Sequence, residues 1–163
     1  MVTLTAEQIG SSIADAGKAV FYGIYFDSGQ SVIKPESAPT LAEMAKWLQG
    51  NPQARVNIVG HTDMQGDVGQ NRTLSRARAE AVVNALVTEH GLSIERLAAE
   101  GAGPFAPVSN NTTEQGRAQN RRVEMVLRQD PCACGSMGAT VLIRDRGIDR
   151  GIGWWSRTVR ARD

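Results

Sequence analysis

The sequence predicts an α/β fold, a two-layer sandwich in which a mixed β-sheet has its helices packed on one face. Along residues 19–128, apolar stretches of strand length alternate with stretches whose apolar residues have helical spacing, in the order β-α-β-α-β-(short α)-β. Strands separated by helices need crossover connections, which place helices against the sheet. The composition, 41% hydrophobic and 21% charged, is that of an ordinary soluble globular protein.

We expect the chain to have three parts. Residues 1–18 form an N-terminal amphipathic helix, residues 19–128 form the main domain, and residues 129–163 form a tail of poorly specified structure. The segment at 5–8 (TAEQ) resembles a helix capping box, and Gly17 is expected to end this first helix.

The first strand is expected at residues 19–26 (AVFYGIYF), which are apolar on both parities and therefore indicate a strand buried on both faces. A helix is expected from Pro35 to Gly50, because proline is tolerated in a first helical turn and glycine favours a helix end. The core stripe of this helix comprises Leu41, Met44, Ala45 and Leu48.

The second strand is expected at residues 55–60, and a polar loop at 61–70 leads into the longest helix. Asn71 is the expected N-cap of that helix, which runs to about Glu89. The remaining elements are a third strand at 96–100 that breaks at Gly101-Ala102-Gly103-Pro104, a short helical turn after Thr112, and a last strand at 121–128 with Val123, Met125 and Leu127 inward.

The net charge of +1 provides no overall field that would favour nucleic acid or an anionic membrane surface. Residues 1–128 carry 12 basic and 13 acidic side chains, a net −1, whereas residues 129–163 carry 6 and 4, a net +2. Cys132 and Cys134 both lie in the tail and suffice neither for a disulfide framework nor for a zinc site. We expect no cofactor and no metal.

No apolar run reaches the roughly eighteen residues that a membrane-spanning helix needs. The N-terminal residues also lack the basic segment and apolar core of a secretory signal. We therefore expect either a cytoplasmic protein or a chain whose export segment lies upstream of Met1.

An arginine and an aspartate stand out in the strand-loop-helix stretch at residues 57–86. At about 100° per residue, Arg78 falls within the apolar stripe of the helix, where an unpaired charge is costly. Asp63, in the loop before the helix, is the nearest carboxylate by topology. One interpretation is a plain Asp63–Arg78 salt bridge that pins the loop to the helix.

The other interpretation is a ligand site. The loop lies where a strand ends and a helix begins, and ligands of open α/β sheets gather at such positions. The helix N-terminus beside Asn71 also offers free backbone N–H groups to a carboxylate. With Asp63 and Arg78, this helix end suits a ligand that carries an ammonium and a carboxylate on one carbon, since arginine can hold a carboxylate in a bidentate manner.

Five motifs follow one another along residues 60–124. They are GHTD-x-x-G at 60–66, N-x-x-LS-x-x-RA-x-x-V at 71–82, RL at 96–97, G-x-G-x-x-x-PV at 101–108 and N-x-T-x-x-GRA-x-NRRVE at 111–124. Phe26-Asp27 and then Ile33-Lys34-Pro35 precede them. Together they resemble the OmpA-like peptidoglycan-binding domain, the type found in OmpA, Pal and MotB, and the resemblance covers residues 19–128.

The resemblance implies a non-enzymatic module that binds peptidoglycan through the diaminopimelate of the stem peptide and anchors an envelope protein or assembly to the wall. It implies that Asp63 takes the ammonium of the ligand and Arg78 the carboxylate. Further positions that match the family's motifs near its pocket are Thr62, Asn71, Arg121, Phe26 and Asp27. A strand-end role for Arg121 and a pure capping role for Asn71 stay open. The implied location is the periplasm, at the outer membrane or cell wall.

Two other functions stay open. Asp27, His61 and Asp63 could serve as acid–base groups of a cell-wall hydrolase, although the chain has no metal-ligand spacing and no nucleophile motif such as G-x-S-x-G. The same fold could instead bind another envelope protein, with Trp154-Trp155 of the tail in the contact. The sequence does not decide whether the chain forms a homodimer.

Overall fold

The computed structural model describes residues 3–27 and 29–128; the tail expected at residues 129–163, with its tryptophan pair, lies outside the described residues. In chain order the elements are α1 (Ala6–Ala16), β1 (Lys18–Phe21), the 3-10 helix η1 (Pro35–Ser37), α2 (Ala38–Gly50), β2 (Val56–His61), α3 (Val68–Thr88), η2 (Ile94–Arg96), β3 (Leu97–Gly103), α4 (Glu114–Asn120) and β4 (Val123–Leu127). In the described part of the chain, no helix is both long and apolar enough to cross a membrane.

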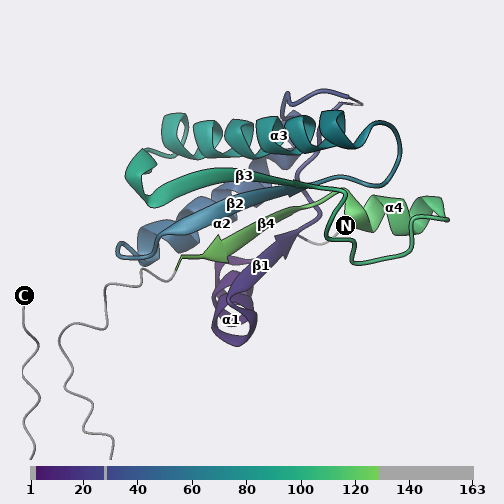
Figure 1. The fold of residues 1–163 in the computed structure, drawn as a ribbon. Helices are drawn as coiled ribbons and strands as arrows, with labels where there is room; N and C mark the ends of the chain where they lie inside the picture. Colours follow the sequence, from purple (N-terminus) through teal and green to yellow (C-terminus); the bar gives the residue numbers. More distant parts are fainter. Residues whose placement is uncertain (1–2, 28, 129–163) are drawn as a thin grey trace, which may run out of the picture. The chain divides into compact units, whose positions relative to one another are not determined.

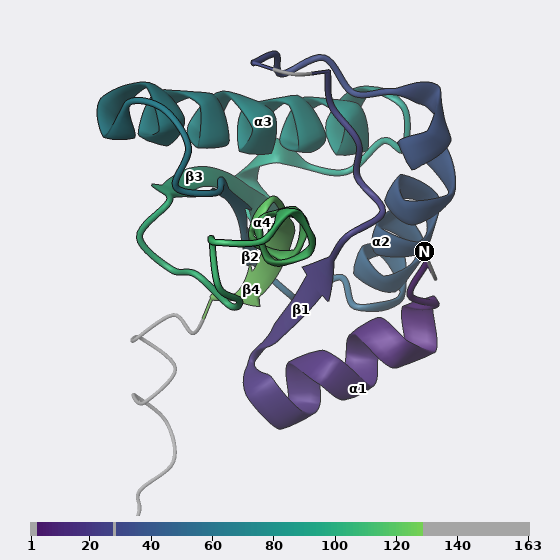
Figure 2. The ribbon, with the colours of Figure 1, turned by 90° about the vertical axis from the view of Figure 1, so that its right-hand side faces the viewer.

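The four strands follow the order β1-β4-β2-β3 across the sheet. β2 and β3 are parallel, whereas β4 runs antiparallel to both of its neighbours, β1 and β2. Figures 1 and 2 show α1, α2 and α3 along one face of the sheet, with α4 beside the edge where β4 begins. The predicted mixed sheet with helices packed on one face is therefore confirmed.

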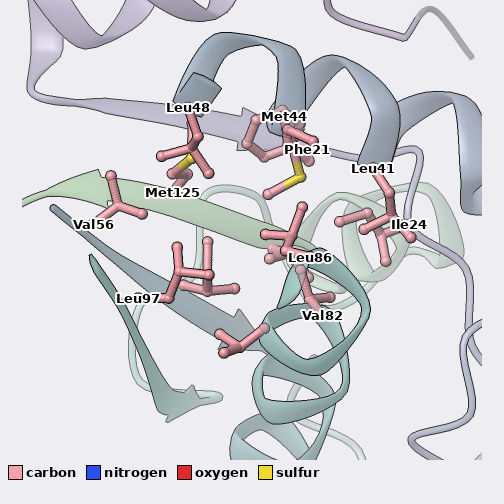
Figure 3. Close-up of a cluster of buried hydrophobic side chains, with 14 of the residues drawn as sticks. Phe21, Ile24, Leu41, Met44, Leu48, Val56, Val82, Leu86, Leu97 and Met125 are labelled. Atoms are coloured by element: carbon pink, nitrogen blue, oxygen red, sulfur yellow. The ribbon is translucent and has the colours of Figure 1, made fainter. Parts of the chain in front are cut away.

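The core fills the space between the sheet and these three helices. Val56 and Ile58 of β2 and Met125 of β4 are fully buried, and they meet apolar side chains of α2 and α3 such as Leu48 and Leu86 (Figure 3). Burying side chains of this size contributes about 1.5–3 kcal/mol each to the free energy of unfolding. The second strand predicted at residues 55–60 therefore has its counterpart in β2.

The N-terminal helix α1 belongs to the same core. Thr5 and Gln8 form the predicted capping box, and Gly17 ends the helix with a φ of 70°. This left-handed conformation carries no steric penalty for glycine. Ile9 and Ile13 of α1 are buried in the hydrophobic core, so α1 is part of the helical layer.

The first strand is shorter than predicted, because β1 ends at Phe21. Beyond it, the hydroxyls of Ser37 and Thr40 hydrogen-bond the backbone of the next four residues at 2.8 and 3.2 Å. These hydroxyls take the place of a neighbouring strand, and only an isolated bridge between Phe26 and Ile33 remains. The prediction of one strand through residue 26, buried on both faces, was wrong for this reason.

The long helix α3 begins one turn earlier than predicted. Its N-cap is Asp67, whose carboxylate accepts a hydrogen bond from the backbone N–H of Gln70 at 2.8 Å. Asn71 lies inside the helix, and its amide donates to the carbonyl of Gln65 at 2.6 Å. The prediction of Asn71 as N-cap was wrong, because aspartate and asparagine cap helices equally well and the pattern could not choose between them.

Two other elements are longer than predicted. β3 continues to Gly103, which pairs with His61 after a register shift in β2. α4 continues past Gly116 to Asn120. In both cases glycine does not break the element; it sits where a side chain would collide with a neighbouring backbone.

Candidate functional site

A cavity of about 670 Å³ lies where β1 and β2 end and β4 begins. Its walls come from the segment after β1, the loop after β2, the first half of α3, and α4. Six of the seven predicted site residues line it, namely Phe26, Thr62, Asp63, Asn71, Arg78 and Arg121. The exception is Asp27, whose exposed carboxylate pairs with Lys34 Nζ at 2.7 Å and does not line the cavity.

Asp63 lies in the loop directly after β2, and its side chain is 10% exposed. Its Oδ1 accepts a hydrogen bond from the backbone N–H of Gln65 at 3.0 Å. Its Oδ2 pairs with Nη1 of Arg121 at 2.6 Å. The carboxylate is therefore held in a fixed orientation at the edge of the cavity.

Arg78, in α3, also lines the cavity, and its guanidinium lies over the ring of Phe26 at 5.0 Å from the ring centroid. Nε donates to the carbonyl of Gln30 at 2.9 Å and Nη2 to that of Asp27 at 3.2 Å, while Nη1 has no partner among the described residues. Burial, and then the positive charge of Arg121, lower the pKa of Arg78. An arginine still stays charged at neutral pH, so Arg78 presents a poorly compensated positive charge to the cavity.

Two glycines allow α3 to lie directly on the strands. A Cβ at Gly60 would collide with the carbonyl oxygen of Ser75, and a Cβ at Gly101 would lie 2.6 Å from the backbone nitrogen of Arg76. Ser75 Oγ also accepts a hydrogen bond from the backbone N–H of Gly103 at 3.0 Å. Because of this close contact, the turn of α3 that carries Arg78 lies next to the loop after β2.

Asp63 and Arg78 face one cavity but form no ion pair with each other in the described part of the chain. Asp63 pairs with Arg121, and Arg78 is held by backbone carbonyls. The interpretation as a plain Asp63–Arg78 salt bridge therefore does not hold. The two charged groups therefore line one cavity without pairing with each other.

The remaining predicted residues have distinct positions. Thr62 is buried, its backbone N–H donates to the carbonyl of Gly103 at 3.0 Å, and its hydroxyl has no partner among the described residues. Asn71 braces the loop through its bond to Gln65. Phe26 supplies the ring beneath the guanidinium of Arg78.

Sequence reasoning missed Glu114, which also lines the cavity and pairs with Arg121 Nη2 at 2.6 Å. It also missed how the last motif holds the loop after β2. Asn111 Oδ1 accepts hydrogen bonds from the backbone N–H of Met64 at 3.1 Å and from Asn120 Nδ2 at 3.0 Å. The conspicuous N-x-T and NRRVE spacing was the available signal for this brace.

A buried polar cluster adjoins the cavity, which two of its members, His61 and Arg122, also line. Arg122 pairs with Glu124 at 2.7 Å, Lys18 bonds the other oxygen of the same carboxylate at 2.9 Å, and Nε2 of His61 lies 3.7 Å from Glu124 Oε1. Burial, and then the charge of Arg122, lower the pKa of His61 to about 4. His61 is therefore neutral at pH 7. No group of three or more metal-binding side chains occurs within residues 3–27 and 29–128.

Comparison with known proteins places this geometry in a family. The chain is 41% identical over 104 residues to the probable lipoprotein YiaD of Escherichia coli K12, an alignment that covers 64% of this chain and 47% of that protein. It also resembles the crystal structure of the peptidoglycan-associated lipoprotein from Burkholderia pseudomallei, with a TM-score of 0.57, 31% identity, and coverage of 70% of this chain and 92% of that one.

A third match is the structure of the cell wall anchor of the T6SS from Pseudomonas aeruginosa, with a TM-score of 0.59 and 27% identity over 79% of this chain and all of that one. The chain spans about half or less of the length of the first curated relatives, YiaD and the outer membrane protein Omp38 of Acinetobacter baumannii. The sequence model of the OmpA family matches residues 25–121, so this chain belongs to the OmpA family.

Proposed function

We propose that this chain binds peptidoglycan non-covalently through the free zwitterionic end of diaminopimelate in the stem peptide. It would thereby anchor an envelope protein or assembly to the wall, in the periplasm at the outer membrane or cell wall. The observation that carries the proposal is that Asp63 and Arg78 line one cavity and pair with other groups, not with each other. A negative and a positive group that do not neutralise each other can grip the two ends of an amino-acid head.

The individual contacts suit this ligand. The ammonium would join Asp63 Oδ1 and Oδ2, each of which has lone pairs beyond its one hydrogen bond. The carboxylate would bind Nη1 of Arg78, while Nε and Nη2 of the same guanidinium each donate one hydrogen bond to a backbone carbonyl. Because these carbonyls and Phe26 fix the guanidinium in advance, little side-chain entropy is lost on binding.

The relatives support the choice of ligand. One solved structure is named a peptidoglycan-associated lipoprotein and another a cell wall anchor, and both cover most of this chain. Their names do not say which part of peptidoglycan is bound. The proposal of diaminopimelate as the ligand is therefore based on the cavity and on the motif resemblance. The same cavity would serve whichever envelope protein or assembly carries it.

We propose binding without hydrolysis. The acid–base set of Asp27, His61 and Asp63 does not assemble, since Asp27 pairs with Lys34 outside the cavity. The pKa of His61, lowered to about 4 by burial, makes this side chain a poor proton carrier at neutral pH. We expect no soluble muropeptide release when the protein is incubated with sacculi.

The test is sedimentation with purified sacculi. Replacing Asp63 or Arg78 by alanine should lower the affinity at least tenfold, because each variant removes a charge-assisted contact worth about 1.5–3 kcal/mol. The matched controls are Arg76→Ala and Glu80→Ala, which break an exposed pair on the same helix outside the cavity. If both cavity variants sediment as the wild type does, the proposal is wrong.

Competition in the same assay addresses the ligand. Free diaminopimelate should displace the protein from sacculi, whereas lysine with its α-amine acetylated and its α-carboxylate amidated, which keeps the side-chain ammonium but has no carboxylate beside it, should not at equal concentration. The difference should vanish in Arg78→Ala. Equal competition by the two amino acids in the wild type would contradict the role given to Arg78.

A further inference from the structure

Arg121 is shared between two carboxylates at the cavity. Its Nη1 pairs with Asp63 at 2.6 Å and its Nη2 pairs with Glu114 at 2.6 Å. The two partners differ in exposure, because the side chain of Asp63 is 10% exposed and that of Glu114 is 66% exposed. Arg121 thus has one firmly held partner and one that water reaches freely.

Glu114 has a second partner that it can keep. Its Oε2 pairs with Nη2 of Arg117 at 2.6 Å, one turn along α4, while Oε1 takes Arg121. If Glu114 released Arg121, its carboxylate would still be paired. Exposed ion pairs of this kind contribute little to stability, so the exchange of one carboxylate for another at Arg121 is nearly neutral.

The two arginines of the cavity act on each other. The charge of Arg121 contributes to the lowered pKa of Arg78, and Asp63 only partly offsets it. The guanidiniums of Arg78 and Arg121 line the same cavity, and so does Glu114. Such an arrangement favours ligands with more than one anionic group.

The cavity is larger than one zwitterionic head. Such a head has about six heavy atoms, and at about 30 Å³ for each, the volume that one water takes in the liquid, it would fill on the order of 180 Å³. The cavity measures about 670 Å³, so most of it lies beyond the groups that Asp63 and Arg78 would hold. A longer part of the ligand can therefore enter.

We propose that Arg121 is a second carboxylate-binding position of this cavity, at which Glu114 stands in for the ligand. The carboxylate it takes would be the free α-carboxylate of the residue that precedes diaminopimelate in the stem peptide. On binding, this carboxylate replaces Glu114 at Nη2 of Arg121, and Glu114 stays with Arg117. The inference rests on the proposed function, because it concerns a second contact of the same ligand.

The test uses two synthetic peptides that end in diaminopimelate and differ at one group. In the first, the preceding glutamate has a free α-carboxylate; in the second, that carboxylate is an amide. Wild-type protein should bind the first peptide more tightly. In Glu114→Gln, the affinity for the first peptide should rise about two- to fivefold, since an exposed competing ion pair is lost, and the affinity for the amide should stay within error.

Two further variants separate this role from general structural effects. Arg121→Gln should bring the ratio of the two affinities to about one, whatever it does to the affinities themselves. Glu80→Gln removes a similarly exposed carboxylate, paired with Arg76 outside the cavity, and should change neither affinity. Isothermal titration calorimetry of each variant with each peptide gives all the required constants.

The outcomes distinguish the two proposals. If wild-type protein binds both peptides equally and Glu114→Gln changes nothing, Arg121 is not a carboxylate position, although peptide binding through Arg78 stands. The inference is also overturned if Glu114→Gln weakens binding or strengthens both peptides alike. If the wild type binds neither peptide, the proposed function itself fails and this inference with it.

Discussion

His61 is the last residue of β2, and its ring is buried beside two charged groups, Arg122, which directly precedes β4, and Glu124 of β4. Neither ring nitrogen has a hydrogen-bond partner among the described residues, and Lys18 adds a further positive charge nearby. Burial and the two cations oppose protonation, and only Glu124 favours it. The folded protein therefore holds this histidine neutral.

The pH dependence of stability follows from this environment. The pKa of His61 is about 4 in the folded protein and about 6.5 when the chain is unfolded, so between these values the unfolded state binds more protons. Above pH 6.5 the group has no effect, and stability falls as the pH drops toward 4. Between pH 7 and pH 5 the wild type should lose on the order of 2 kcal/mol that His61→Gln does not lose, measured by urea unfolding at both pH values.

The chain's other histidine provides the control. His90 is only half buried, at the end of α3, and lies outside the polar cluster. His90→Gln, which removes an imidazole outside the cluster, is the matched control substitution. A wild type and a His61→Gln variant with parallel pH profiles would show that His61 binds its proton as readily in the folded state as in the unfolded chain.

At this scale, the sequence predicted six residues that line the cavity, but it did not predict their partners. Arg78 was placed within an apolar helix face and Asp63 at a strand end, and both line the cavity. The partner of Asp63 was missed because it is a residue far along the chain, Arg121, at the C-terminal end of α4. The order of elements along the chain pairs a loop carboxylate with a cation on the helix that follows it. It does not show that a cation much later in the sequence lies closer in the folded structure.

At the scale of elements, the contact of α3 with β2 depends on a glycine, Gly60. The position of a Cβ at Gly60 coincides with the carbonyl of Ser75, and a backbone atom of a 21-residue helix cannot yield as a flexible side chain could. Gly60→Ala should lower the free energy of unfolding by about 2–3 kcal/mol, as overpacking does. It should also weaken sacculus binding, since the helix that carries Arg78 must shift.

A glycine in open surroundings is the matched control. Gly50 ends α2 with nothing within 4 Å of its would-be Cβ, so Gly50→Ala should raise the free energy of unfolding by about 0.5–1 kcal/mol. Chemical denaturation of the two variants measures both effects. A Gly60→Ala protein as stable as the wild type would mean that α3 does not press on β2 as described.

Element boundaries could be predicted where one local signal decided them. The capping box at Thr5 and the glycine at position 17 bounded α1 correctly because both act within one helical turn. The end of β1 was missed because the hydroxyls of Ser37 and Thr40 decide it, and their role depends on how α2 packs. Glycines in β3 were taken as breakers for the same reason, since only the neighbouring helix explains them.

For the whole molecule, the alternation of strands and helices was enough to predict the layers, because crossover connections leave few ways to cover a sheet. The strand order β1-β4-β2-β3 could not be predicted from the sequence. The last strand inserts between the first two, and this pairing depends on contacts between residues that are distant in the sequence, such as Phe21 with Val123. Such a closure also means that the fold is complete only when both ends of the described chain are present.

This closure leads to a prediction about the shortest chain that folds. The family match covers residues 25–121, yet a chain cut to that stretch lacks α1, β1 and β4. It would lose Ile9, Ile13, Ala19, Phe21, Ile24, Val123 and Met125 from the core. At about 1.5–3 kcal/mol for each large apolar side chain, the loss is comparable to the entire 5–15 kcal/mol stability of a typical domain.

We therefore expect the chain of residues 25–121 to be unfolded and the chain of residues 3–128 to unfold cooperatively. Dispersion of the amide NMR signals and urea unfolding would measure both. The longer chain should also bind sacculi, because every residue of the cavity lies within it. A dispersed spectrum from residues 25–121 would show that helices α2 and α3 with β2 and β3 suffice for a core, and that β4 is not the strand that completes the sheet.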